Sequence, residues 1–166
     1  MRSTASIERL AKRVRARLGC EEGAVDLHQL CERLDLTFVA RTLPDGTSGM
    51  LVRRPEGNVL VVDQTEPVQR RRFTAAHEIG HLLLHKDAEI FVDYRDKRSQ
   101  SGRDPKEIEA NRFAAALLMP EHLLRRDAES STALDDDELI QELARRYEVS
   151  KTAMSIRLSS LGLIGW

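Results

Sequence analysis

The sequence has few of the features that mark secreted, membrane or nucleic-acid-coating proteins. Its two cysteines, Cys20 and Cys31, form no CxxC pair, and residues 1–18 contain no uninterrupted apolar segment of the kind found in signal peptides and membrane spans. The formal net charge of the 166 residues is −1, which provides no overall basic field to attract nucleic acid. We therefore expect a reduced, cytoplasmic globular protein with no membrane partner, long enough to bury a core.

The most informative segment is the apolar run FTAAHEIGHLLLH, residues 73–85. In a helix, His77 and His81 share one face and can bind a single metal ion. Glu78 lies about 100° around the helix from His77, where it can reach a water on the open side of the ion. The flanking leucines and alanines indicate a buried helix, in which these polar groups would be costly without a metal. The pattern predicts a hydrolytic Zn²⁺ site with Glu78 as catalytic base.

A catalytic zinc ion usually takes three protein ligands, so one more must be found. His85 lies about 12 Å along the helix from His77, too far to share the ion, and we expect it to act as a cation near the helix C-terminus. Asp87 has the spacing of an extended motif whose turn requires glycine, and this sequence has Leu84 there. Neither residue is therefore a good third ligand.

The helix predicted to begin at Asp104-Pro105 supplies better candidates. Glu107 and Asn111 are four residues apart and share a face, so Glu107 could bind the metal while Asn111 orients a metal-binding histidine. Glu107 could instead complete a capping box with Asp104. Glu109, close by in helical register, is the alternative ligand, and the residues alone leave these possibilities open.

The rest of the sequence predicts an α+β, zincin-like fold. Three runs have strand character: residues 37–41, 50–53 and 59–63. They predict a small antiparallel sheet packed on the HExxH helix and on the second, glutamate-bearing helix. A polar stretch at residues 127–137 predicts a linker between a core that carries the zinc site, residues 1–126, and a helical segment, residues 138–166. We expect that segment to form a helix-turn-helix-like pair packed on the core.

The run RRRFTAAHEIGHLLLH, followed by KEIEANRFAAALLMP, resembles the ImmA/IrrE family of metallo-endopeptidases, and the likeness covers roughly residues 25–164. The resemblance implies that His77, His81 and Glu107 hold zinc and that Glu78 is the catalytic base. Members of that family cut a DNA-binding repressor. We therefore expect a zinc endopeptidase whose partner is a cytoplasmic helix-turn-helix repressor, and no long sensor domain after Trp166.

Peptide hydrolysis at such a site would need further groups around the metal. The zinc ion would polarise the scissile carbonyl, and Glu78 would move a proton from water to the leaving amine. The strand Ser48–Arg53 is a candidate for pairing with an extended substrate backbone. Candidates for stabilising the oxyanion are Tyr94, Arg98 and His122.

The alternative function is that of a DNA-binding or toxin-antitoxin type interaction module with a metal site. Ala144, Val149 and Ser150 fall where a helix-turn-helix places its small and capping residues, but Glu148 occupies the turn position that favours glycine. Between residues 134 and 166 there are six acidic residues and four basic ones, which is unfavourable for phosphate contacts. We therefore expect no direct binding of nucleic acid.

Overall fold

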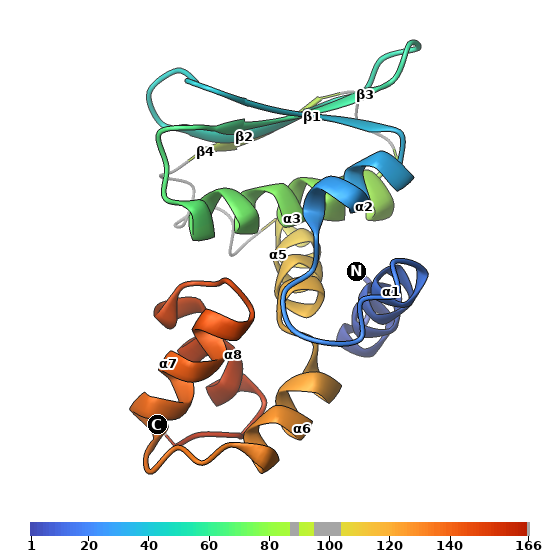
Figure 1. The fold of residues 1–166 in the computed structure, drawn as a ribbon. Coiled ribbons are helices and arrows are strands. Elements are labelled where there is room, and N and C mark those ends of the chain that lie inside the picture. The colour runs from blue at the N-terminus through green and yellow to red at the C-terminus, as the bar shows by residue number, and fades with distance from the viewer. Residues whose placement is uncertain (87–89, 95–103, 166) are drawn as a thin grey trace.

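The computed structural model describes residues 1–86, 90–94 and 104–165, with the segment 90–94 described by its backbone (Figure 1). The elements in chain order are α1 (Thr4–Arg17), α2 (Leu27–Arg33), β1 (Leu36–Arg41), β2 (Thr47–Val52), β3 (Asn58–Asp63), α3 (Val68–Leu84), β4 (Ile90–Tyr94), α5 (Pro105–Leu118), α6 (Glu121–Ser130), α7 (Asp136–Arg146) and α8 (Lys151–Ser160). These elements confirm the α+β class. In the described parts of the chain, no helix is long and apolar enough to cross a membrane.

The four strands form one mixed sheet in the order β1-β3-β2-β4. β2 is antiparallel to both of its neighbours, but β1 runs parallel to β3. The prediction of an antiparallel sheet is therefore wrong at β1, because a strand's own residue pattern does not specify its distant partner. The prediction that Ser48–Arg53 pairs with substrate is also wrong, because β2 already has a strand on each side. The edges of the described sheet are β1 and β4.

The helix α3 lies across one face of this sheet, and α5 runs from α3 toward the C-terminal helices (Figure 1). Two glycines permit the close packing of these layers. A Cβ atom at Gly49 of β2 would collide with Thr74 of α3, and a Cβ atom at Gly80 of α3 would lie 3.2 Å from the Cα and carbonyl oxygen of Ala110 on α5. α3 is therefore held tightly between the sheet and α5.

The connection to the C-terminal helices is shorter than the sequence suggested. α6 continues to Ser130 and α7 begins at Asp136, so the structure contradicts a linker over the whole of 127–137. The physical reason is that Asp127, although charged, is buried, with its carboxylate accepting a 2.6 Å hydrogen bond from the hydroxyl of Tyr147 and pairing with Arg146 at 3.1 Å. This polar residue thus joins α6 to the end of α7.

The pair α7 and α8 meets at a tight corner, as predicted. Glu148 adopts a left-handed conformation, with φ of 53°, at the position where a helix-turn-helix favours glycine. Its carboxylate forms a 3.2 Å ion pair with Arg72 of α3, and Val149 and Met154 are buried. The corner is therefore anchored to the helix that carries the histidines.

Candidate metal centre

Three potential ligands converge between α3 and α5. The Nε2 atoms of His77 and His81 are 3.0 Å apart, and each lies 3.3 Å from one oxygen of Glu107. All three side chains offer a ligand atom within 4.8 Å of the others. A tetrahedral zinc ion with bonds of about 2.0–2.1 Å places its ligand atoms about 3.3 Å apart. The spacing in this cluster therefore fits zinc.

Glu107 reaches the histidines because of how α5 begins. The carboxylate of Asp104 accepts a 2.8 Å hydrogen bond from the amide of Lys106, which caps the helix. Both oxygens of Glu107 face the two imidazoles instead of turning back toward the cap. The close approach of α5 to Gly80 brings this first turn against α3. Of the two alternatives left open by the sequence, the geometry favours the ligand over the capping box.

The pKa shifts also suit a metal site. Burial lowers the pKa of His81, so its imidazole is neutral. Burial alone would raise the pKa of Glu107, but the imidazoles of His77 and His81 that face its carboxylate outweigh that effect and hold the pKa well below its usual value. Neutral imidazoles and an ionised carboxylate are the protonation states that bind divalent metals.

Asn111 orients His77 from the side opposite the cluster. Its side-chain oxygen lies 3.0 Å from Nδ1 of His77, and an amide oxygen can only accept, so Nδ1 carries the proton. The Nε2 atom of that ring consequently presents a lone pair to the cluster. The structure thus brings Asn111 to the histidine as the spacing with Glu107 suggested.

His81 is oriented by a series of contacts through His85 to Glu109, which was not predicted from the sequence. Its Nδ1 lies 3.0 Å from Nδ1 of His85, and Nε2 of His85 lies 3.2 Å from a carboxylate oxygen of Glu109. Glu109 also accepts hydrogen bonds from the backbone amide and the guanidinium of Arg2. If Nδ1–H of His81 donates to His85, and His85 donates to Glu109, then Nε2 of His81 is free of a proton and faces the cluster.

This chain of contacts corrects two expectations. His85 is not a cation at the helix end, because it is buried and its burial lowers its pKa. Glu109, the alternative ligand, binds His85 and Arg2 instead of approaching the three converging side chains. The four-residue spacing of His81 and His85 on one face of the helix could have indicated that these two residues are in contact. That spacing could not have indicated their further partners, Glu109 of α5 and Arg2 near the N-terminus.

The remaining candidate residues are distributed as follows. Glu78 is completely buried on α3, beneath β2. A Cβ atom added at Gly49 of β2 would lie 3.8 Å from the Cγ atom of Glu78. His122 is exposed on α6 near the charges of Lys12 and Arg15, so the structure does not bring it to the histidine cluster. Asp87, Arg98 and the side chain of Tyr94 lie outside the described residues.

Comparison with known proteins extends these observations. Residues 31–159 match the Peptidase M78 family, described as the IrrE N-terminal-like domain. The chain is 37% identical over 137 residues to the radiation response metalloprotease IrrE of Deinococcus deserti, covering 77% of this chain and 44% of the relative. It is 36% identical over 126 residues to IrrE of Deinococcus radiodurans, covering 72% and 35%. The chain thus spans less than half the length of these two relatives.

Two more distant proteins are also similar to this chain. The metallopeptidase ImmA of Bacillus subtilis is 21% identical over 140 residues, covering 84% of this chain and 79% of ImmA. A solved structure of a Mycobacterium tuberculosis transcriptional regulator superposes with a TM-score of 0.65 at 23% identity, over 93% of this chain and 46% of that one, and shows that the fold is shared. Since the family match covers most of the chain, the protein belongs to the ImmA/IrrE family of metallopeptidases.

Proposed function

We propose that the protein is a zinc-dependent endopeptidase that cleaves a cytoplasmic protein, namely a helix-turn-helix transcriptional repressor. The observation that carries the proposal is the convergence of His77, His81 and Glu107 beside the buried Glu78. Asn111 orients His77 so that the Nε2 lone pair faces the carboxylate of Glu107, and a cation between such acceptors would satisfy both in this buried cluster. The metalloprotease relatives support the reaction class.

The chain's own residues would divide the chemistry as follows. Zinc bound here would supply a Lewis acid that polarises the scissile carbonyl and lowers the pKa of water. The carboxylate of Glu78 would accept a proton from the attacking water and deliver it to the leaving nitrogen. Asn111 and His85 would keep the two imidazoles in the tautomer that leaves Nε2 unprotonated.

The substrate backbone would enter along β4. This strand is the edge of the described sheet next to β2, and it also contacts α3. An edge strand can accept an extended polypeptide as a further strand, whereas a stably folded helix must open first. Cleavage would therefore be selective for linkers or for helices that unfold transiently.

Metal analysis of two variants tests the ligand set. Glu107→Ala should lose the bound zinc, because it removes one of three ligands. Glu109→Ala should still bind zinc when zinc is in excess, because Glu109 contacts His85 and not the cluster. Retention of stoichiometric zinc by Glu107→Ala would remove that residue from the ligand set.

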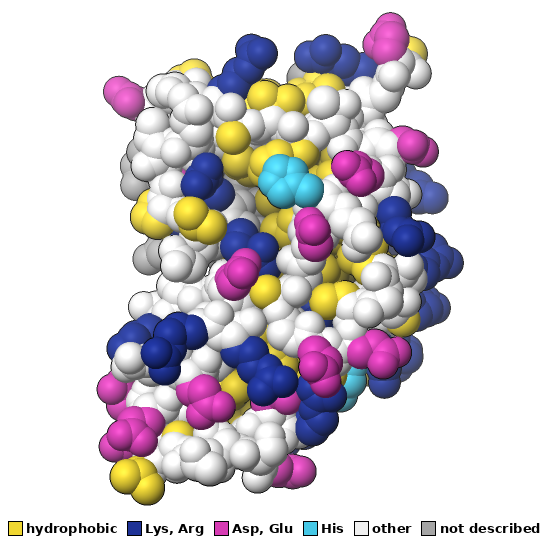
Figure 2. All heavy atoms as spheres, viewed as in Figure 1, with side chains coloured by type: hydrophobic (Ala, Val, Ile, Leu, Met, Phe, Trp, Pro, Cys, Tyr) yellow, Lys and Arg dark blue, Asp and Glu magenta, His cyan; other side chains and the backbone are white. Residues whose placement is uncertain are grey.

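DNA binding remains the second candidate function, since Glu148 gives the corner between α7 and α8 the left-handed turn of a helix-turn-helix. Two observations oppose it. Ser150, Thr152 and Ala153 at the start of α8 face α3 and α5 across a hollow, so a DNA duplex, which is wider than a single helix, would meet those helices before its base edges reached these residues. On the face shown in Figure 2, acidic and basic side chains are interspersed. Gel-shift assays with duplex DNA should show no specific complex, and a specific complex would favour this candidate.

A further inference from the structure

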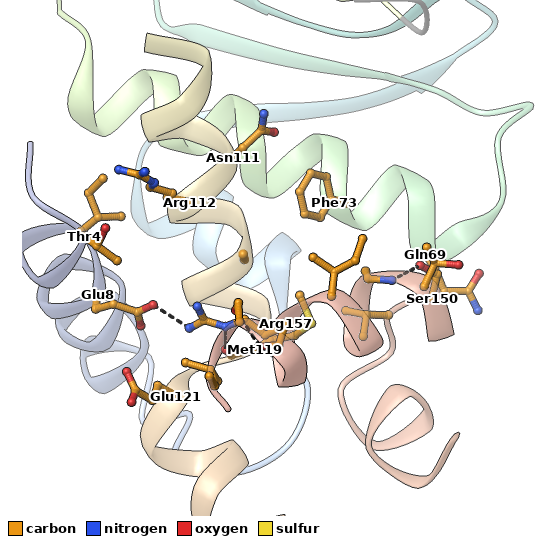
Figure 3. Close-up of a pocket in the computed structure, with 18 of the residues that line it drawn as sticks. Thr4, Glu8, Gln69, Phe73, Asn111, Arg112, Met119, Glu121, Ser150 and Arg157 are labelled. Carbon is orange, nitrogen blue, oxygen red and sulfur yellow. Dashed lines mark hydrogen bonds and ion pairs between the residues drawn. The ribbon is translucent and has the colours of Figure 1, made fainter. Parts of the chain in front are cut away.

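A groove of about 1050 Å³ separates the helices that carry the histidines and Glu107 from the C-terminal pair (Figure 3). We refer to it as the interhelical groove. Its apolar walls include Phe73 of α3, Ala115 of α5 and Ile156 of α8. Ile156 is 65% exposed there, which is unusual for a large apolar side chain in the described part of the protein. An apolar surface of this kind favours a bound partner.

The charges around the interhelical groove are predominantly basic. Three of its four arginines are paired with a carboxylate: Arg70 with Glu66 at 3.9 Å, Arg125 with Glu121 at 2.8 Å and Arg157 with Glu8 at 2.6 Å. Arg112 of α5 also lines the groove, and it forms no hydrogen bond or ion pair with any residue that the structure describes. The excess charge of the walls is therefore positive, and it is complementary to a partner that carries carboxylates beside its apolar residues.

The walls of the interhelical groove also indicate the conformation of the partner. They come from helices and the residues that flank them, and among the residues that the structure describes none of those lining the groove belongs to a β-strand. An extended peptide would find no strand edge for its backbone hydrogen bonds, whereas a helix satisfies its own. A helix about 10 Å wide occupies about 120 Å³ per residue, so the volume of the groove is of the same order as that of a short helix of a few turns.

The interhelical groove is connected to the metal centre by two side chains. Asn111 and Phe73 both line the groove (Figure 3). Asn111 also contacts Nδ1 of His77, and Phe73 lies one helical turn before His77 in the sequence. A helix bound in the groove therefore rests on both elements that supply the ligands. The chain that continues from such a helix would lie next to the catalytic residues.

We propose that the interhelical groove is a docking site for an amphipathic helix of the substrate protein, with acidic residues flanking its apolar face. This inference rests on the proposed peptidase function for the identity of the partner, but the binding itself does not depend on catalysis. The helix would hold the substrate while a neighbouring segment enters the active site.

Fluorescence anisotropy with two synthetic peptides tests the proposal. Both would be amphipathic helices of about 14 residues, near the length at which isolated helices become stable, with leucines on one face. One peptide carries glutamates beside the leucines and the other carries lysines. The acidic peptide should bind the zinc-loaded protein, and the basic one should bind at least about tenfold more weakly.

Matched variants assign the binding to the groove. Arg112→Glu and Ile156→Asp should each weaken binding of the acidic peptide by about tenfold or more, since one reverses the unpaired charge and the other removes an apolar contact. Arg13→Glu and Leu134→Asp are the controls, because Arg13 and the 89% exposed Leu134 do not line the groove. The two control variants should bind the acidic peptide with the same affinity as the unmodified protein. All four variants should retain zinc.

Equal binding of the two peptides, or equal weakening by the groove variants and the control variants, would overturn the docking proposal. Tight binding of duplex DNA that Arg112→Glu abolishes would overturn it as well. Hydrolysis of peptide bonds is measured separately. If the protein binds the acidic peptide in the groove but hydrolyses no substrate, only the proposed peptidase function is contradicted. If it hydrolyses its substrate but does not bind the acidic peptide, only the docking proposal is contradicted.

Discussion

Replacing Gly80 with alanine tests whether the contact between α3 and α5 controls metal binding. A Cβ at this position would lie 3.2 Å from the Cα and carbonyl oxygen of Ala110. Because these are backbone atoms, no side-chain rotation relieves the overlap, and the two helices must move apart. Glu107 lies three residues before Ala110 on α5, so the same movement draws its carboxylate away from the histidines.

Two effects on stability oppose each other in Gly80→Ala. Alanine is favoured over glycine in a helix interior by about 0.8–1.0 kcal/mol. Forcing a methyl group into a close-packed contact costs about 1–3 kcal/mol. We therefore expect the free energy of unfolding of the metal-free protein, measured in urea, to fall by about 1 kcal/mol.

The effect of Gly80→Ala on metal affinity should be larger than its effect on stability. Ligand distances in metal sites tolerate deviations of only about 0.2 Å, so we expect zinc affinity to fall by about tenfold or more. Competition with a chromophoric chelator measures this affinity. The new Cβ would also lie 3.2 Å from Cδ1 of Phe113, but adding Phe113→Leu to the variant should not restore zinc affinity, because the overlap with the backbone of Ala110 remains. A Gly80→Ala protein that is about 1 kcal/mol more stable and binds zinc normally would refute the reasoning.

Three further predictions concern other buried groups. Glu109→Gln should weaken zinc binding about 10- to 100-fold in the chelator assay, because it weakens the support of His81 through His85. Asp127→Ala should lower the free energy of unfolding in urea by about 1–3 kcal/mol, because the buried hydroxyl of Tyr147 loses its acceptor. Burial raises the pKa of Cys31 to about 12, so the unfolded thiol ionises first and stability should fall as pH rises from about 9. Urea titrations at several alkaline pH values should show a smaller fall for Cys31→Ala.

Much of the candidate metal centre could be predicted from the sequence because its geometry is local. Four-residue spacing on a helix fixes the pairing of His77 with His81, and the same spacing places Glu107 and Asn111 on one face of α5. The residues alone left Glu107 and Glu109 open as the third ligand, because the choice depends on which face of α5 meets α3, and the resemblance to the family favoured Glu107. In the structure, the two helices meet at the close contact at Gly80.

The parts that could not be predicted depend on contacts between distant segments. The sequence gives no sign that Arg2 reaches Glu109, which lies 107 residues away. Likewise, the parallel pairing of β1 with β3 depends on where β2 inserts, and strand periodicity does not encode that choice. Asp127 resembles a loop residue by polarity and became a buried partner of Tyr147 only through the packing of α6 on α7.

The most direct test of the proposed peptidase function is co-expression with a helix-turn-helix repressor, which we expect to be encoded by a neighbouring gene. The repressor would be produced with either the unmodified protein or Glu78→Gln, and the products would be analysed by mass spectrometry. Both proteins should bind one zinc ion, since Glu78 lies outside the converging ligands. The unmodified protein should cut the repressor into two defined fragments, and Glu78→Gln should cut it about 10²- to 10⁴-fold more slowly. An intact repressor beside the zinc-loaded, unmodified protein, or equal cleavage by Glu78→Gln, would contradict the account.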